Sequence, residues 1–242
     1  MSKTRKAILV VSFGTSFPDT CKKTIDVIEQ RIGEHFSDYK IYRAWTRKMI
    51  MAKLLKRDNI RINNVTEAME QMIADGITEV IVQPTHVING IENDLMKEDA
   101  LAFKNRFERI TFGDPLLTTQ QDHVEIVNAI CQEFSNLPAD CALILMGHGT
   151  SHYANDVYAA LDYRFKDLGF SNIHLATVEG YPTLENVTRM VKEQEAKKVI
   201  LAPFMIVAGD HARNDMSGDD EDSWKNQFRA AGYDVECRMK GL

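Results

Sequence analysis

The stretch Ala142-Leu-Ile-Leu-Met-Gly-His-Gly-Thr-Ser151 repeats the pattern of Ala7-Ile-Leu-Val-Val-Ser-Phe-Gly-Thr-Ser16. Each is an apolar run that ends in Gly-Thr-Ser. A second pair keeps the same order and spacing: Val80-Ile-Val-Gln-Pro-Thr-His-Val-Ile-Asn-Gly90 matches Val199-Ile-Leu-Ala-Pro-Phe-Met-Ile-Val-Ala-Gly209, with a proline at the fifth position of both. The chain is therefore predicted to contain the same half twice.

Amphipathic segments lie between these apolar runs. In one of them, Val65, Ala68, Met69 and Met72 follow the three-and-four spacing of a helix with one buried face. Short apolar strands that alternate with such helices are typical of parallel sheets. We therefore predict an α/β fold of two similar domains, each a four-stranded, mainly parallel sheet flanked by helices, with a cleft between the domains. The strands are expected near residues 7–12, 40–45, 79–84, 108–112, 142–147, 172–178, 198–205 and 234–239.

The two halves differ at their ends. The first half follows its last strand with a helical pattern near residues 121–135, whereas the second half stops at Gly241-Leu242. We expect an N-terminal domain over residues 1–137 and a C-terminal domain over residues 138–242 that lacks a closing helix. A helix from the first domain is a candidate to cover this gap.

Composition limits the class of protein. Of the 242 residues, 44% are hydrophobic and 26% are charged, as in a globular domain, and no apolar run approaches the ~20 residues of a membrane span. The net charge of −6 argues against a nucleic-acid partner, because neutralising phosphates takes a basic surface. The run Ala7 to Val11 is too short for a signal-peptide core, and the four cysteines lie too far apart for a zinc or redox motif. We expect a cytoplasmic protein that neither enters a membrane nor binds nucleic acid.

Three side chains suited to metal binding follow expected strands of the second half, namely His148, Glu179 and His211. Ligands of open parallel sheets bind at the carboxyl ends of the strands, so these three groups are expected to meet at one edge. Two imidazoles and a carboxylate suit a divalent first-row metal and leave coordination positions open. Histidine is also a suitable base near neutral pH, and we expect His148 to act as one.

The spacing of these residues is weak evidence on its own. A single histidine near a strand end more often has a hydrogen-bonded structural role, and gaps of roughly thirty residues match no general metal motif. In the first half, His86 is a candidate to contact a ligand, and Glu92 a candidate to draw in metal or handle protons. A polar loop that satisfies its own backbone explains these two residues equally well.

A basic stretch stands out in this acidic chain. It comprises Lys40, Arg43, Arg47, Lys48, Lys53, Lys56, Arg57 and Arg61. Such a stretch attracts a substrate with several carboxylates. A solvated helix face is the better explanation for Lys56, Arg57 and Arg61, whereas Arg43 and Arg47 lie nearest a strand end and are the candidates for substrate binding.

Five motifs spread over essentially the whole chain carry a family resemblance. They are Ser12-Phe-Gly-Thr-Ser16, Pro84-Thr-His-Val-Ile-Asn-Gly-Ile-Glu-Asn-Asp94, Met146-Gly-His-Gly-Thr-Ser-His152, Val178-Glu-Gly-Tyr-Pro182 and Pro203-Phe-Met-Ile-Val-Ala-Gly-Asp-His211. Together they resemble the anaerobic cobalt chelatases, the CbiK type of class II chelatase. The resemblance implies insertion of Co²⁺ into sirohydrochlorin during oxygen-independent cobalamin synthesis, without ATP and without an organic cofactor.

The resemblance also implies roles for individual residues. His148 would be the principal base and a metal ligand, Glu179 and His211 would complete the metal site, and Glu92 would assist catalysis. Gly149 would let the flat macrocycle come close, because glycine has no Cβ. The remaining substrate contacts would be Ser12, Phe13, Gly14, Thr15, Arg43, Arg47 and His86. The expected partners are the tetrapyrrole, the divalent metal ion and further copies of the chain in a homo-oligomer.

Two other functions fit the same residues. A chelatase that loads iron or nickel would use the same ligands, and a protein that binds a metal or a finished tetrapyrrole without inserting anything would use the same two-domain cleft. Other chemistries fit poorly, because the chain has no Gly-x-Ser-x-Gly elbow, no phosphate loop and no Gly-x-Gly-x-x-Gly fingerprint after a strand.

Overall fold

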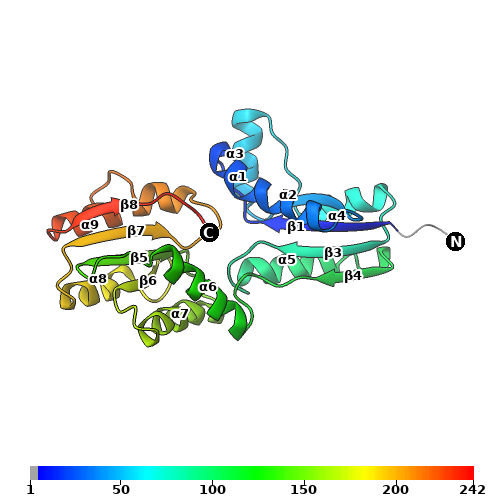
Figure 1. The fold of residues 1–242 in the computed structure, drawn as a ribbon. Coiled ribbons are helices and arrows are strands. Elements are labelled where there is room, and N and C mark those ends of the chain that lie inside the picture. The colour runs from blue at the N-terminus through cyan, green and yellow to red at the C-terminus, as the bar shows by residue number, and fades with distance from the viewer. Residues whose placement is uncertain (1–4) are drawn as a thin grey trace. The chain divides into compact units, whose positions relative to one another are not determined.

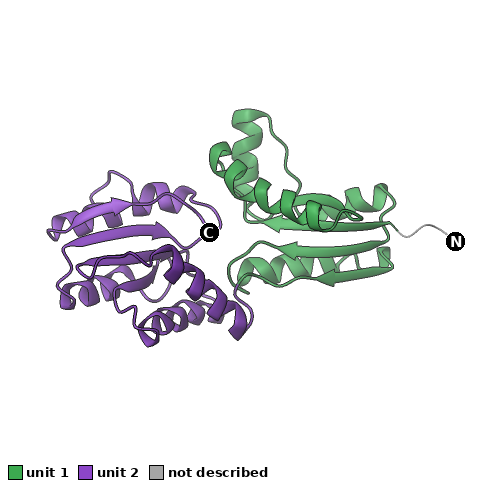
Figure 2. Cartoon of the chain, viewed as in Figure 1, with its two compact units in different colours: residues 1–116 green, residues 117–242 purple. Residues whose placement is uncertain are grey.

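Two compact units make up the chain in the computed structural model, which describes residues 5–242 (Figure 2). Unit 1 is Met1–Leu116 and unit 2 is Leu117–Leu242. Each unit contains a four-stranded sheet in which every neighbouring pair of strands is parallel (Figure 1). The strand orders are β2-β1-β3-β4 and β6-β5-β7-β8, so the second sheet repeats the first. The predicted fold class, two similar parallel α/β halves, is confirmed.

Unit 1 alternates strands with helices. Its elements in chain order are β1 (Lys6–Ser12), α1 (Pro18–Lys23), α2 (Ile25–His35), β2 (Lys40–Trp45), α3 (Lys48–Asp58), α4 (Val65–Ala74), β3 (Glu79–Pro84), α5 (Ile91–Leu101), a 3₁₀ turn (Lys104–Arg106) and β4 (Arg109–Phe112). Each of the four strands lies within one or two residues of its expected position.

Unit 2 begins with a helix and then follows the same plan. Its elements are α6 (Gln120–Glu133), β5 (Cys141–Gly147), a 3₁₀ turn (Tyr153–Asn155), α7 (Asp156–Asp167), β6 (Ile173–Thr177), α8 (Leu184–Glu193), β7 (Lys198–Pro203), a π-helical turn (Ala212–Met216), α9 (Trp224–Ala230) and β8 (Asp234–Cys237). None of the helices within residues 5–242 combines the length and the apolar character that crossing a bilayer requires.

The apolar positions that predicted the helices form the cores. In unit 1, α4 buries Val65, Ala68, Met69 and Met72 against the strands, and α5 adds Met96 to the same cluster. In unit 2 the corresponding cluster joins the strands to Val187 and Val191 of α8 and to Trp224 and Phe228 of α9. Burying a large apolar side chain stabilises a fold by about 1.5–3 kcal/mol. The loops at the strand ends are thus attached to two well-packed cores.

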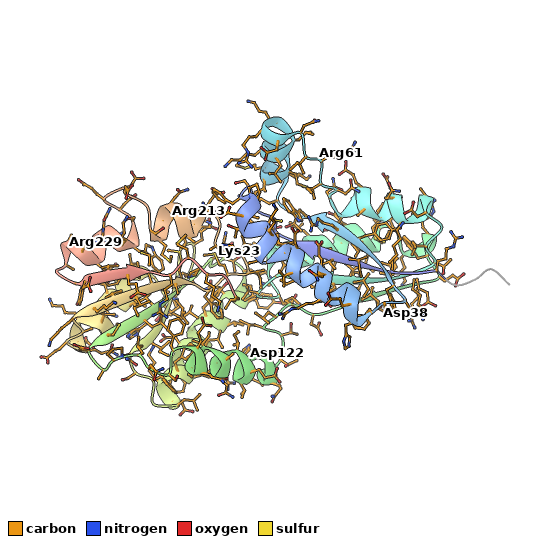
Figure 3. All side chains as sticks on the ribbon, turned by 45° about the horizontal axis from the view of Figure 1, so that its top comes forward. Lys23, Asp38, Arg61, Asp122, Arg213 and Arg229 are labelled. Atoms are coloured by element: carbon orange, nitrogen blue, oxygen red, sulfur yellow. The ribbon has the colours of Figure 1, made fainter. Side chains whose placement is uncertain are left out.

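Helix α6 belongs to unit 2, although the sequence pattern assigned it to the first domain and set the boundary near residue 137. The helix packs against α7, and a capping box that includes Asp122, which is labelled in Figure 3, fixes where it begins. There Asp122 accepts from the backbone N–H of Thr119 at 2.6 Å, while Thr119 accepts from the backbone N–H of Asp122 at 3.2 Å. At its other end, Lys240 donates to Glu133 at 2.8 Å. The helix therefore ties both the start and the end of unit 2 together.

Candidate functional site

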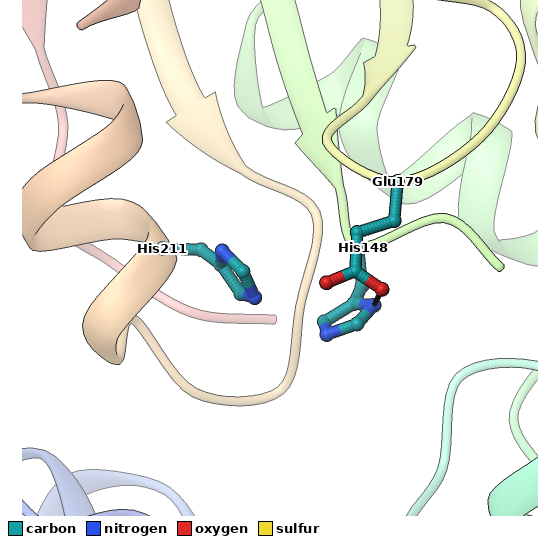
Figure 4. A group of neighbouring side chains, drawn as sticks. All are labelled: His148, Glu179 and His211. Atoms are coloured by element: carbon teal, nitrogen blue, oxygen red, sulfur yellow. Dashed lines mark ion pairs between the residues drawn. The ribbon is translucent and has the colours of Figure 1, made fainter.

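His148, Glu179 and His211 come together at one edge of the unit 2 sheet (Figure 4). They follow three adjacent strands, because the sheet order is β6-β5-β7 and His148 follows the middle strand, β5. Parallel strands end on the same edge, which is where open α/β sheets bind ligands. The convergence expected from the sequence is therefore present.

Backbone hydrogen bonds carry the β5–β6 pairing past the ends of the strands. The N–H of Val178 donates to Gly147 O at 3.1 Å, and the N–H of Glu179 donates to His148 O at 2.8 Å. On the other side of β5, the N–H of Phe204 donates to Met146 O at 2.7 Å. The sheet itself thus sets the positions of His148 and Glu179.

The three side chains offer one ligand atom each, and these atoms lie within 4.8 Å of one another. His148 Nδ1 is 3.9 Å from Glu179 Oε2. The rings of His148 and His211 meet edge to face with their centroids 4.7 Å apart. The side chain of Glu179 is 58% exposed and those of the histidines about a third, so ligands from outside the protein can reach the group. An open set of two imidazoles and a carboxylate suits a divalent first-row metal.

Each imidazole has an oxygen beside its Nδ1. For His148 it is the carbonyl oxygen of Gly149 at 2.8 Å, and for His211 it is Oδ2 of Asp215 at 2.6 Å. Both oxygens are acceptors, which assigns the ring proton to Nδ1 and the lone pair to Nε2 in each neutral ring. Such hydrogen bonds orient metal-binding histidines. The sequence interpretation missed the role of Asp215, although its spacing of four residues from His211 was a readable signal.

The His148 loop is held by tight contacts. Gly149 has a left-handed backbone, with φ at +79°, and a Cβ there would lie 2.6 Å from the backbone N of Gly180. Asn155 joins the two loops, because its side chain accepts from the N–H of Thr150 at 3.1 Å and donates to Tyr181 O at 2.7 Å. Asn155 is a second residue that sequence reasoning missed, and no motif marked it.

Tyr158 of α7 supports the same loop from inside unit 2. Its ring packs where a Cβ on Gly147 would lie, 2.7 Å from the ring, and its hydroxyl is hydrogen-bonded to the backbone of Gly149. Burial raises the pKa of Tyr158 to about 12, even though that hydrogen bond lowers it. The hydroxyl is therefore neutral and serves as a structural contact.

Unit 1 repeats the extended strand pairing with different side chains. The N–H of Thr46 donates to Ser12 O at 3.0 Å, and the N–H of Arg47 donates to Phe13 O at 3.3 Å. Phe13 and Arg47 thus occupy the places of His148 and Glu179. The Arg47 guanidinium lies over the Phe13 ring, 5.6 Å from its centroid, as a cation–π pair. This edge offers a cation where unit 2 offers a candidate metal site.

Of the two arginine candidates, Arg43 is already occupied. Its guanidinium pairs with Glu29 at 2.6 Å and with Asp26 at 2.5 Å. Burial lowers the pKa of Arg43, but the two carboxylates raise it more and keep the group charged. Arg47 is exposed, and no carboxylate among residues 5–242 pairs with it. Arg47 is therefore the better candidate for a substrate carboxylate.

The other expected substrate residues lie at the carboxyl edge of the unit 1 sheet or next to it. Ser12 ends β1 and accepts from the hydroxyl of Thr85 at 2.9 Å, while Thr15 accepts from the N–H of Phe17 at 3.2 Å. Gly14 has a φ of +96°, and a Cβ there would lie 2.5 Å from the ring of Trp45. Glu92 is partly exposed in the first turn of α5, a position where a carboxylate also stabilises the helix dipole.

Several buried polar atoms at this edge have no hydrogen-bond partner among residues 5–242. They are Ser16 Oγ, Trp45 Nε1, Thr46 Oγ1 and both ring nitrogens of His86. Each follows or ends one of the adjacent strands β1, β2 and β3. Buried polar groups that no protein group satisfies are uncommon and costly. These polar atoms are therefore not needed for hydrogen bonds within the described fold, and they are available to bind a polar ligand.

Burial also makes His86 a source of pH-dependent stability. Desolvation lowers the pKa of His86 to about 4, against about 6.5 in an unfolded chain. The unfolded state then binds the proton first, so the free energy of unfolding is expected to fall as the pH drops from about 6.5 to about 4. Urea unfolding of the wild type and of His86→Phe across this range will test it. The variant should show the smaller loss at low pH, and parallel curves would show that His86 has no such effect.

Comparison with known proteins gives a consistent family. The family model described as cobalt chelatase (CbiK) matches residues 6–242. The sirohydrochlorin cobaltochelatase of Salmonella typhimurium is 38% identical over 238 residues, which cover 98% of this chain and 90% of that protein. The sirohydrochlorin cobaltochelatase CbiKC of Nitratidesulfovibrio vulgaris is 32% identical over 235 residues, covering 95% and 81%.

A solved structure shares the fold. The sirohydrochlorin chelatase SirB from Bacillus subtilis subspecies spizizenii, in complex with cobalt, superposes with a TM-score of 0.62 at 14% identity, covering 98% of this chain and 88% of that one. At that identity the match speaks for the fold only. The family match over residues 6–242 and the 38% identity to the Salmonella typhimurium protein lead to one conclusion: this chain belongs to the CbiK cobalt chelatase family.

Proposed function

We propose that this protein inserts Co²⁺ into sirohydrochlorin, and that His148, Glu179 and His211 receive the ion before it passes to the macrocycle. The observation that carries the proposal is the convergence of these three side chains on one exposed sheet edge. The names of the two similar curated proteins support the choice of tetrapyrrole and metal. Cobalamin synthesis is the pathway that uses this product.

The reaction exchanges one divalent ion for two protons. As the four nitrogens of the macrocycle bind Co²⁺, the two pyrrole N–H bonds break and the protein or solvent takes up the protons. In the proposal, His148 accepts these protons in turn and passes them to water, because its side chain is about a third exposed. No oxidation state changes, so the chemistry calls for no organic redox cofactor. Glu92 remains a candidate to assist proton transfer.

An incomplete ligand set suits this task. A structural site closes four tight bonds around its metal, whereas a site with three protein ligands keeps a position open. A carboxylate and two imidazoles at an exposed edge release an ion more readily than a buried closed site does. The macrocycle with its four nitrogens is then the stronger competitor for the ion.

The substrate carboxylates are proposed to bind at the unit 1 edge. Support comes from the exposed guanidinium of Arg47 and from the unsatisfied polar atoms of Trp45, Thr46 and His86. Carboxylates accept from all four types of donor, and a charged pair with arginine is the strongest of these contacts. Ser12, Phe13, Gly14 and Thr15 form the adjoining strand end. At Gly149 the space that a Cβ would take is filled by Thr177 and the Glu179–Gly180 backbone, so this glycine serves the packing of the two loops. Homo-oligomer formation and a cytoplasmic location stay predictions of the sequence.

The direct test mixes the protein with sirohydrochlorin and Co²⁺ and follows the absorbance of the tetrapyrrole and the release of protons. We expect insertion well above the uncatalysed rate, with two protons released per cobalt inserted. Competition with Fe²⁺ and Ni²⁺ separates cobalt insertion from a preference for another metal. A spectral change without proton release would identify a binding protein and contradict the proposal.

Replacing Arg47 with alanine tests the substrate edge. Loss of a charged hydrogen bond costs about 1.5–3 kcal/mol, so the KM for sirohydrochlorin is expected to rise by roughly 10–100-fold, while Co²⁺ affinity stays unchanged. Lys56→Ala removes the same charge from an exposed position on α3 and serves as the control. Equal KM values for wild type and Arg47→Ala would remove Arg47 from the binding site.

A further inference from the structure

The two histidines of the metal site differ in what holds them. The hydrogen-bond partner of His148 Nδ1 is neutral, the carbonyl of Gly149 at 2.8 Å, while the Glu179 carboxylate lies beyond hydrogen-bond distance at 3.9 Å. His211 Nδ1 lies 2.6 Å from an anionic acceptor, the carboxylate of Asp215. A charge-assisted hydrogen bond is shorter and stronger than a neutral one. An anionic partner on Nδ1 also makes Nε2 a better donor to a metal ion. The site therefore contains two imidazoles of unequal ligand strength.

The His211–Asp215 pair is fixed from the core side. His211 directly precedes the π-helical turn Ala212–Met216, and both Ala212 and Met216 are fully buried in the unit 2 core. Ser217 closes the turn, because its N–H donates to Ala212 O at 3.2 Å and its hydroxyl donates to the same oxygen at 2.8 Å. Isolated π-helical turns occur frequently at functional sites. The turn fixes the backbone that carries both residues. The hydrogen bond between His211 Nδ1 and Asp215 then sets the direction of the His211 ring.

The side chains themselves reach outward. The side chain of His211 is 30% exposed and that of Asp215 47%, while Ala212 and Met216 of the same turn are buried. Figure 4 shows the imidazole of His211 facing that of His148, with the Glu179 carboxylate beside it. With the ring proton on Nδ1 toward Asp215, the lone pair of His211 is on Nε2. Asp215 is the only residue whose contact with His211 both selects this tautomer and adds negative charge, among the residues the structure describes.

We propose that Asp215 is a positioning residue that makes His211 the stronger imidazole ligand of the site. This inference rests on the proposed function. His211, backed by Asp215, holds the incoming ion most tightly, whereas His148 is the ligand that gives way first as the macrocycle nitrogens bind. His148 is then available as the base at the moment when the pyrrole protons leave.

Two substitutions separate orientation from charge. Asp215→Asn keeps an oxygen that can accept from Nδ1 but removes the charge, and Asp215→Ala removes both. Asp220→Ala is the matched control, because it deletes an exposed carboxylate from the same segment without touching the histidines. Circular dichroism and urea unfolding confirm that each variant is folded, and the nearly isosteric Asn variant keeps the test valid if the alanine variant is not.

The readout is Co²⁺ affinity, measured by calorimetric titration of the protein with Co²⁺ and no tetrapyrrole. We expect affinity to fall by about 10–100-fold in Asp215→Ala, the range found when such orienting partners are removed, and by a smaller factor in Asp215→Asn. The KM for Co²⁺ should rise in parallel, with the KM for sirohydrochlorin unchanged.

Equal Co²⁺ affinity in the wild type and both Asp215 variants would overturn the inference, as would an equal loss in Asp220→Ala. Because the titration contains no tetrapyrrole, it gives its answer even if the protein does not catalyse insertion. Wild-type protein that binds Co²⁺ in this Asp215-dependent way but inserts none would contradict the proposed function alone.

Discussion

Replacing His148 with alanine is expected to reduce cobalt insertion by about 10²–10⁴-fold in kcat, the range for loss of a positioned acid or base. The change removes both a metal ligand and the proposed proton acceptor. The fold should persist, because the side chain lies at a sheet edge and is about a third exposed. The free energy of unfolding is expected to change by no more than about 1 kcal/mol.

Initial insertion rates at saturating sirohydrochlorin and Co²⁺, together with urea unfolding, measure the two effects separately. His35→Ala provides the control, because His35 is an exposed histidine in the last turn of α2 in unit 1. That variant should keep the wild-type rate. An active His148→Ala enzyme with unchanged kcat would rule out the proposed base.

Replacing Gly149 with alanine is expected to damage both the fold and the metal site. A Cβ at φ +79° would lie 2.6 Å from the backbone N of Gly180 and 2.8 Å from the Cβ of Thr177. A left-handed alanine costs about 1–2 kcal/mol, and overpacking adds about 1–3 kcal/mol. Relief of the clash moves the backbone beside Glu179, so Co²⁺ affinity should fall as well.

Gly169 offers a matched control for Gly149 in the same unit. Its φ is +88°, but a Cβ there would meet nothing within 4 Å. Gly169→Ala should therefore show only the conformational cost of about 1–2 kcal/mol, with Co²⁺ affinity unchanged. Urea unfolding and Co²⁺ titration of both variants make the comparison. Equal destabilisation of the two proteins would mean that the Gly149–Gly180 contact is not tight.

The strands and their parallel arrangement were predictable because their signals are local. The central strands β1, β3, β5 and β7 each contain a short apolar run, and the repeat of one pattern predicted two equal sheets. The unit to which α6 belongs was not predictable in this way. The apolar face of an amphipathic helix can pack against any apolar surface, so its periodicity does not say which unit it joins. The contact between α6 and α7 assigns α6 to unit 2, and the sequence pattern contains no signal for that contact.

The convergence of the three candidate metal ligands was predictable to the level of strand ends and no further. Topology places His148, Glu179 and His211 on one edge, since three neighbouring strands must end there. Whether Arg43 is available to a substrate depends instead on its ion pairs with Glu29 and Asp26 of α2. Packing sets how this helix is rotated relative to β2. The choice between Arg43 and Arg47 therefore needed coordinates. Asn155 was missed for a similar reason, because its two partners come from different loops.

The backbone pairing that continues past β5 and β6 sets the starting distance between the candidate ligands His148 and Glu179. The spacing of neighbouring strands, about 4.7–4.9 Å, fixes how far apart His148 and Glu179 begin, whatever side chains stand there. In unit 1 the same extended pairing places Phe13 beside Arg47. The same backbone geometry thus holds two candidate metal ligands in unit 2 and a cation–π pair in unit 1. The backbone sets the distances at both edges, so the side chains at the strand ends decide what each edge can bind.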